Sequence, residues 1–321
     1  MKFVAPTVTP KGLARRVPPA IFPSLLGLFG LGLGWRQAGM AFDLPGGAAE
    51  AFLGGATLLY LFALGAYLVK LVRRPGAILD DLRTLPGRLG LSAMLACLYL
   101  QATVLAPYLP DPARWLVVVA LVLHGGLIAL ILWTFFKGPA EARRYSPAGH
   151  LYFVSPIIGA VAAAQAGYDY LAMGLGVATL GIGAGVWAWG ADRLRQRPPA
   201  AALRPLLALH LAPAALAGML AMYLGLTTVA TIVAALTAVL FASLGLAGRW
   251  LTEGGFAPLW SVVTYPLAAA ASLWLLMGGA WSVAGALVLI ATTFVNIAIA
   301  FRVLKLWAGG QLAVKTNAAI A

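Results

Sequence analysis

The sequence predicts an all-α integral membrane protein with ten transmembrane helices arranged as five hairpins. First, 62% of the 321 residues are hydrophobic and only 10% are charged, which is more apolar surface than a soluble domain of this length buries. Second, most of the apolar segments approach the roughly 20 residues that a helix needs to cross a bilayer core. Third, prolines occur in alternate segments, which predicts pairs of one bent and one straight helix.

The ten apolar segments follow one another with short polar connections. The fifth segment is short for a membrane span, and the sixth begins almost directly after it. We therefore predict a cytoplasmic N-terminal tail over residues 1–18, a ten-helix transmembrane domain over 19–306, and a cytoplasmic C-terminal tail over 307–321. The predicted segments are 20–41, 47–69, 89–106, 113–136, 151–166, 168–190, 205–224, 227–247, 257–278 and 281–304.

The prolines mark the odd-numbered segments. Proline removes a backbone hydrogen-bond donor and clashes with the preceding helical turn. In a membrane such a helix is tolerated where neighbouring groups or a water-filled cavity satisfy the freed carbonyl groups. We therefore predict helix kinks in segments that face a cavity, at Pro23, Pro156, Pro213 and Pro266, whereas Pro86 only precedes the third segment.

The distribution of positive charge predicts the topology. If all ten segments cross the membrane, every one of the 22 lysines and arginines except Arg36 and Arg114 lies on one side. An excess of Lys and Arg marks the cytoplasmic side, so we expect a multi-pass protein of the cell (inner) membrane with both termini cytoplasmic. The net charge of +13 is scattered over separate loops. This pattern suits anionic lipid headgroups and argues against nucleic-acid binding.

The centres of the predicted segments contain no Asp, Glu, Lys or Arg. Ion-coupled pumps usually place ionisable groups at membrane depth, so their absence favours passive conduction or a carrier that relies on dipoles and histidine. Within the segments, Thr264 and His210 are candidate polar groups of the pathway, and His210 shares its segment with a proline. For His124 we expect a buried histidine that is hydrogen-bonded to a neighbour.

No catalytic or metal-binding pattern is visible in the sequence. The three histidines lack metal-ligand spacing, and no cluster of cysteines or carboxylates accompanies them. The single cysteine, Cys97, lies in an apolar run, where it is expected to act as a small core side chain. We therefore expect no enzymatic activity and no metal or other cofactor.

Several motifs in order resemble one known family. The ninth segment runs from Phe256 to Tyr265-Pro266, with an aromatic residue directly before the proline, as in the plant guard-cell slow anion channels. The seventh segment contains His210-Leu-Ala-Pro213, and the fifth begins His150-Leu-Tyr-Phe-Val-Ser-Pro156; both are similar to bacterial tellurite-resistance proteins. The entry to the third segment and the end of the tenth add weaker matches. From about residue 18 to 312, the chain resembles the tellurite-resistance/dicarboxylate transporter family.

The resemblance implies a specific architecture. Proteins of this family place five helical hairpins around a quasi-fivefold central pore, with the odd-numbered helices lining it, and assemble as homotrimers with one pore per protomer. An aromatic residue of the ninth helix occludes the pore. The matching residue here is Tyr265, where the family more often has phenylalanine, and Pro266 would set the direction of the ring.

The leading hypothesis for function is a gated channel for small inorganic or organic anions. The alternative is a carrier for C4-dicarboxylates such as malate, either proton-coupled or not. A membrane-embedded enzyme and a regulatory component without transport are further interpretations. Tellurite resistance, which gives the family its name, could follow from anion conduction alone. Saturable, gradient-driven malate uptake would favour the carrier, whereas linear, voltage-driven chloride or nitrate flux would favour the channel.

Overall fold

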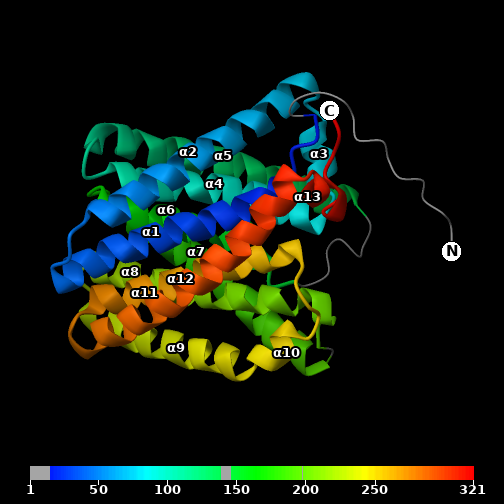
Figure 1. The fold of residues 1–321 in the computed structure, drawn as a ribbon. Helices are drawn as coiled ribbons and strands as arrows, with labels where there is room; N and C mark the ends of the chain where they lie inside the picture. The colour runs from blue at the N-terminus through cyan, green and yellow to red at the C-terminus, as the bar shows by residue number, and fades with distance from the viewer. Residues whose placement is uncertain (1–14, 139–145, 197) are drawn as a thin grey trace.

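The computed structural model describes residues 15–138, 146–196 and 198–321, and this part of the chain is helical and contains no strand. Long helices lie side by side in a bundle (Figure 1). In chain order the elements are η1 (Pro19–Ile21), α1 (Phe22–Phe42), α2 (Gly47–Arg73), α3 (Ala77–Leu82), α4 (Leu85–Leu105), α5 (Pro110–Lys137), η3 (His150–Val154), α6 (Pro156–Gln165), α7 (Asp169–Gln196), η4 (Ala201–His210), α8 (Leu211–Tyr223), α9 (Thr227–Leu246), α10 (Gly248–Thr252), η5 (Pro258–Val263), α11 (Thr264–Met277), α12 (Gly279–Ala308) and α13 (Gln311–Lys315).

Within the described residues, eight helical stretches are long and apolar enough to cross a membrane. They are α2, α4, α5, α7, η4 with α8, α9, η5 with α11, and α12. Two of the ten predicted segments are not among these eight stretches, for separate reasons. The stretch from His150 to Gln165 is shorter, whereas α1 carries Arg36 and Gln37 in its last two turns. The structure therefore supports a multi-pass membrane protein, and ten spans remain a prediction.

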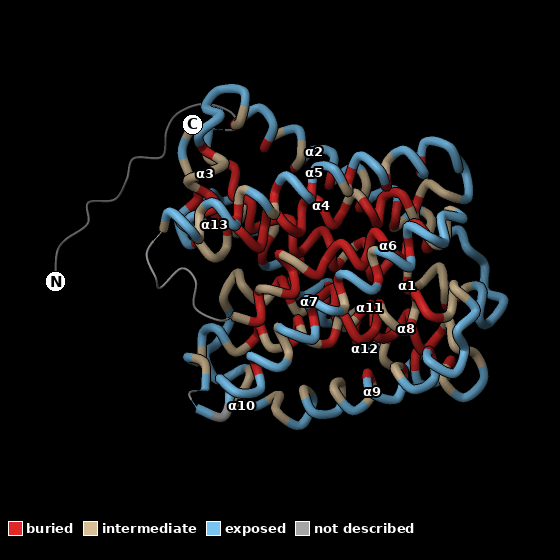
Figure 2. Tube along the Cα trace, turned by 180° about the vertical axis from the view of Figure 1, so that it is seen from behind, coloured by how far each residue is buried: buried red, intermediate tan, exposed pale blue. Residues whose placement is uncertain are grey.

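Burial divides the long helices into an inner and an outer set. In the most apolar part of each stretch, 83% of the residues are buried in α4, 72% in η5–α11 and 61% in η4–α8. The corresponding share is 17–33% in α2, α5, α7, α9 and α12. Buried residues accordingly gather in the middle of the bundle and exposed ones on its outside (Figure 2). The outer helices expose large apolar side chains, such as Val122 and Phe294, as a lipid-facing surface requires.

The inner helices contact one another in a closed order. Helix α1 packs against α4, α4 against α6, α6 against α8, α8 against α11, and α11 against α1. Each inner helix also packs against the long outer helix that follows it in the chain: α2, α5, α7, α9 and α12, respectively. Helices from the beginning and the end of the chain thereby become neighbours: α1 lies beside α11 and α12 (Figure 1).

The prolines of the inner helices lie in their first α-helical turns. Pro23, Pro86 and Pro156 occupy the first or second residue of α1, α4 and α6, while Pro213 and Pro266 are the third residues of α8 and α11. At these positions no intrahelical partner for the missing N–H is lost. Four of these helices are preceded by short 3₁₀ or π stretches, so each of the four prolines coincides with a change of helical geometry.

Glycines of α1 allow the close approach of α11. A β-carbon at Gly27 would lie 1.9 Å from Thr264 Oγ1, and one at Gly30 would lie 2.8 Å from Cδ2 of Tyr265. The Asn296 side chain of α12 donates to the carbonyl groups of Gly27 and Thr264, at 3.3 and 3.1 Å. This three-helix contact holds the start of α11 in place, and with it Tyr265.

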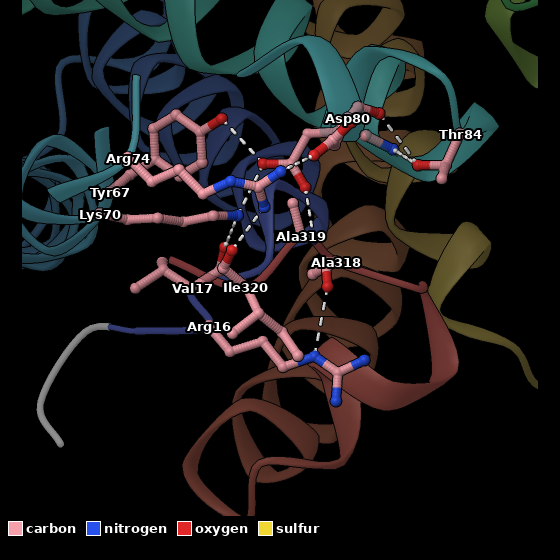
Figure 3. Close-up of polar contacts among 12 residues, drawn as sticks. Arg16, Val17, Tyr67, Lys70, Arg74, Asp80, Thr84, Ala318, Ala319 and Ile320 are labelled. Atoms are coloured by element: carbon pink, nitrogen blue, oxygen red, sulfur yellow. Dashed lines mark hydrogen bonds and ion pairs between the residues drawn. The ribbon is translucent and has the colours of Figure 1, made fainter. Parts of the chain in front are cut away.

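A buried ion pair joins both ends of the chain to the bundle (Figure 3). Lys70 Nζ lies 2.6 Å from Asp81 Oδ2, and both side chains are fully buried. Tyr67 donates to the same carboxylate at 2.9 Å, Lys70 donates to the Val17 carbonyl at 3.0 Å, and the Ala319 amide donates to Asp81 Oδ1 at 2.8 Å. The carboxylate therefore holds α2, α3 and the C-terminal segment together.

Further contacts bring the two chain ends side by side. Arg74 donates to the Ile320 carbonyl at 2.7 Å, and the Ala321 amide donates to the Arg15 carbonyl at 2.8 Å. The described N-terminal residues and the C-terminus thus lie at the same end of the bundle (Figure 1), and Figure 3 shows the contacts between them. Arg36 and Arg114 lie at the opposite end, where they bond to carbonyl groups at the ends of α4 and α6.

Candidate functional site

The inner helices enclose a cavity of about 380 Å³, which we call the vestibule. All five inner helices, α1, α4, α6, α8 and α11, contribute to its wall. It lies at the Arg36 end of the bundle and reaches the surface, since Met40, one of its lining residues, is 67% exposed. Its polar lining comprises Arg36, Gln37, Thr103, Gln165, Tyr223, Tyr265 and Ser272.

A second cavity of about 30 Å³ lies deeper in the bundle and has a largely apolar wall. Its wall includes Pro23 and Leu26 of α1, together with Pro213 and Val262. The polar residues of its wall are His150, Ser155 and Tyr265. Because so small a volume holds about one water molecule, this region is a constriction. A third cavity of about 10 Å³ shares Pro23 and Val262 with it and extends to Thr316, just beyond α13.

Tyr265 lies between the vestibule and the constriction. It contributes to the walls of both cavities, and only 6% of it is exposed. Ile158 and Leu216 are the other residues that both walls share. The ring packs on α1 at Gly30, where a side chain would collide with it. A bulky aromatic side chain thus separates a wide, partly polar space from a narrow, apolar one.

The two other predicted polar groups, Thr264 and His210, do not belong to the walls of the three cavities. Thr264 is 1% exposed and does not belong to the walls of the three cavities. Its hydroxyl group donates to the carbonyl of Ser261 at 2.6 Å and lies 3.4 Å from that of Pro23. It therefore satisfies carbonyl groups at the start of α11, where the 3₁₀ stretch η5 ends.

His210 forms a pair with His150. Nδ1 of His210 lies 2.8 Å from Nε2 of His150, with the rings nearly perpendicular. Of the two, only His150 contributes to the wall of the constriction, so His210 lies behind its partner. Trp187 of α7 packs against the outer side of this pair, 5.5 Å from the His150 ring. The sequence pointed to His210 because of the nearby proline, but the histidine that reaches the cavity is His150.

His124 has the structural role expected from the sequence. Its Nε2 atom lies 3.1 Å from the Ser155 hydroxyl group, and its ring stacks on Tyr99 at a centroid distance of 5.8 Å. The prediction of a buried, hydrogen-bonded histidine is therefore confirmed. Ser155 also donates to the Leu151 carbonyl, one helical turn earlier, at 2.7 Å.

An ion pair at the outer rim of the vestibule is bidentate. Arg36 Nε and Nη2 each lie 2.6 Å from an oxygen of Glu50, the acidic residue in the first turn of α2. Arg36 also donates to the carbonyl groups of Thr103 and Val104 at the end of α4. Glu50 further accepts a hydrogen bond from Tyr108, and this bond raises the pKa of the Tyr108 phenol.

A second polar contact crosses the vestibule wall between α6 and α8. Nε2 of Gln165 donates to the Tyr223 hydroxyl group at 2.7 Å, and Oε1 of Gln165 is buried without a described partner. Neither Gln165 nor Tyr223 was among the site residues predicted from the sequence, although Tyr223 belongs to the seventh-segment motif that resembles the family. Their positions in the sequence could have indicated them. Each lies one residue before the end of a proline-containing predicted segment, at the same end of the bundle as Arg36.

The described residues contain no group of three or more His, Cys, Asp or Glu side chains able to hold a metal ion. The vestibule itself offers one cationic side chain, several amide and hydroxyl groups, and the ring of Tyr265 at its inner end. Such groups can hold a small anion by charge and hydrogen bonds.

Comparison with known proteins agrees with this arrangement. The family model described as voltage-dependent anion channel (SLAC1) matches residues 16–304, which include every inner helix and all the residues that line the vestibule and the constriction. A search of curated proteins gave no match. The resemblance inferred from the sequence motifs is thereby confirmed. The chain belongs to the voltage-dependent anion channel family.

Proposed function

We propose that the protein is a gated anion channel in which the Tyr265 side chain closes the path. The family supports transport of anions. The observation that carries the gating proposal is the position of Tyr265, which forms part of the wall of both the vestibule and the constriction. Conduction would then require the ring to leave the path, since the space beyond it holds about one water molecule.

The closed contact order of the five inner helices supports a central pore. Each of them contributes to the vestibule, so a path along their common axis would be lined by odd-numbered segments only, as in the quasi-fivefold arrangement of ten helices. The four prolines Pro23, Pro156, Pro213 and Pro266 would then set where each of their helices bends toward this axis. We extend the proposal to a homotrimer with one pore per protomer.

Anion preference would follow from the charges at the vestibule. Arg36 is the only charged residue in the vestibule wall among the described residues, and no carboxylate lines it. A single cation in a cavity partly shielded from water raises the local concentration of anions. Because the walls of the two deeper cavities contain no Asp, Glu, Lys or Arg among the described residues, an anion would pass without binding tightly, which favours throughput.

Replacing Tyr265 by alanine tests the gate directly. We expect Tyr265→Ala to raise chloride or nitrate conductance in planar bilayers at least tenfold, since the substitution removes the side chain that separates the two cavities. Tyr265→Phe is the matched control. It keeps the ring and removes only the hydroxyl group, so its conductance should stay near that of the wild type.

Two results would contradict the proposal. One is negligible flux through a folded Tyr265→Ala protein, with folding checked by size-exclusion chromatography. The other is equal conductance in the alanine and phenylalanine variants, which would show that ring volume does not control the path.

The alternative function is a carrier for C4-dicarboxylates such as malate. The size of the vestibule favours it, because about 380 Å³ is within the range of small-molecule pockets. A dicarboxylate, however, calls for two cationic or strongly donating sites, and the described vestibule offers one arginine. Labelled malate uptake into proteoliposomes that saturates and follows a pH gradient would establish the carrier instead of the channel.

We also propose that the end holding both chain ends is cytoplasmic and that the vestibule opens to the outside of the cell membrane. Lysines and arginines are concentrated at the former end, as the positive-inside rule demands. The native cysteine, Cys97, is buried, so a cysteine introduced at Met40 or Ala321 would be the reactive one. We expect a membrane-impermeant thiol reagent, applied to intact cells, to label the Met40 position and not the Ala321 position.

A further inference from the structure

We propose that the vestibule contains an anion-binding site formed by Arg36 of α1 and the Gln165–Tyr223 pair of α6 and α8. The inference rests on the proposed anion transport and names the place where an anion would bind before the gate. Three helices supply these residues, and all three residues belong to the wall of one cavity that Tyr265 closes.

Arg36 retains one uncommitted donor. A guanidinium group has five N–H hydrogens. Nε uses its hydrogen on Glu50, Nη2 uses two on Glu50 and Val104, and Nη1 uses one on Thr103. The second Nη1 hydrogen has no acceptor among the described residues. These bonds also hold the guanidinium group in a fixed orientation, so that an anion would meet a preorganised donor.

The negative partner of Arg36 does not line the same space. Glu50 does not belong to the vestibule wall, and both of its oxygens are occupied by Arg36, with Tyr108 as a further donor. The guanidinium group of the ion pair therefore lines the vestibule, whereas the carboxylate lies behind it. An anion in the vestibule would be closer to the cation than to the carboxylate, and the attraction would exceed the repulsion.

The Gln165–Tyr223 pair supplies a second donor. Nε2 of Gln165 donates to the Tyr223 oxygen at 2.7 Å, so the amide orients the phenol and the phenolic hydrogen remains available for an anion. Oε1 of Gln165 is itself buried, and the hydroxyl group of Tyr223 is therefore the donor that we assign to the site.

The other polar groups of the wall are less suited to bind an ion. The Ser272 hydroxyl group donates to the Ala268 carbonyl at 2.9 Å, and that of Thr103 donates to the Tyr99 carbonyl at 3.4 Å. The expected ligand is accordingly a small monovalent anion that accepts hydrogen bonds, such as chloride or nitrate. With one cation and one neutral donor pair, the site fits a single negative charge.

The site should be accessible in the closed wild-type protein, because it lies on the open side of Tyr265. Binding can therefore be measured without transport, by the excess line broadening of ³⁵Cl⁻ in NMR spectra of detergent-solubilised protein and its reversal by nitrate. We expect line broadening with the wild type. The Gln165→Leu/Tyr223→Phe double variant should lose at least fivefold in chloride affinity, and the Arg36→Gln/Glu50→Gln double variant should lose about tenfold.

The controls separate a local effect from a general one. The Asp111→Asn/Arg114→Gln double variant removes an exposed ion pair at the same end of the bundle and should bind chloride like the wild type. The Tyr223→Phe single variant removes only one oxygen atom. A loss of chloride affinity in this variant would therefore not be due to misfolding, which the larger substitutions could cause. If the site variants broaden the signal as strongly as the wild type does, the inference is wrong.

Failure of this inference can be told from failure of the channel proposal. Suppose that the site variants reduce the broadening, but that the Tyr265→Ala variant passes no anions. The binding site would then stand and the channel proposal would be wrong. Suppose instead that the Tyr265→Ala variant passes anions, but that the site variants do not change the broadening. The channel proposal would then stand and the binding site would be wrong.

Discussion

The two ends of the molecule use an ion pair in opposite ways. At the end that holds the C-terminus, the Lys70–Asp81 pair is fully buried and is hydrogen-bonded to Tyr67, Val17 and Ala319. At the vestibule end, the Arg36–Glu50 pair keeps side-chain exposures of 15% and 32%, and Arg36 borders a cavity. The first pair joins separate elements, whereas the second presents a cation to a water-accessible space.

This difference follows from the cost of burying charge. A buried pair needs enough hydrogen bonds to replace the lost hydration of both ions, and the Asp81 carboxylate accepts three, from Lys70, Tyr67 and Ala319. A pair near water needs less compensation and contributes less to stability, so its geometry can serve another purpose. We therefore expect substitutions at one end to alter stability and those at the other to alter anion binding.

The largest expected effect is that of Asp81→Ala, which should lower the free energy of unfolding by about 3–5 kcal/mol, because it leaves Lys70 buried without its counter-charge. Thermal unfolding in detergent micelles would measure the loss. The Lys70→Met/Asp81→Leu double variant removes both charges and should recover most of it. A double variant as unstable as Asp81→Ala would show that the hydrogen bonds to the chain ends matter more than the charges.

A smaller loss, of about 1–3 kcal/mol, is expected for Gly27→Val, which overpacks the contact between α1 and α11. The added side chain would begin 1.9 Å from Thr264 Oγ1. Gly54→Val on the exposed face of α2 is the matched control, because nothing lies within 4 Å of a β-carbon there. Equal unfolding temperatures of the two variants would show that the α1–α11 contact is not tightly packed, and would weaken the account of how Tyr265 is held.

The smallest effect on stability is expected for Arg36→Gln/Glu50→Gln, at about 1 kcal/mol or less, since the pair is partly exposed. The same unfolding experiment would measure it, alongside the Lys70→Met/Asp81→Leu variant. A loss of more than about 3 kcal/mol would place this pair in the class of buried ion pairs and would remove the contrast between the two ends.

Sequence reasoning was strongest for helices and weakest for side chains at helix ends. Apolar runs predict helices because a membrane leaves the backbone few other ways to satisfy its hydrogen bonds. Tyr265 was predicted from a motif, and the structure places it between two cavities; that it acts as a gate stays a prediction. Thr264 and His210 could not be assigned from the sequence, since position in a segment does not reveal which face of a helix meets the cavity.

Lys70 shows a similar difficulty at the opposite end of the molecule. The sequence places it in a polar connection, where a lysine is normally solvated, yet it is fully buried. Its partner Asp81 is 11 residues away, but the contacts to Val17 and Ala319 span most of the chain. Such long-range partners follow from how the ends of the chain pack and leave no periodic signal in the sequence.

The sequence by itself determined the class of the protein, its helical segments, its charge asymmetry and, through its motifs, its family. These properties depend on composition, on local periodicity and on residues close together in the chain. Tertiary structure alone decided which polar groups border a cavity, that His150 and not His210 reaches the constriction, and that Arg36, Gln165 and Tyr223 share one space. The physical reason is that a cavity wall is built from residues of five helices that are far apart in sequence, and only their packing determines which side chains face one another.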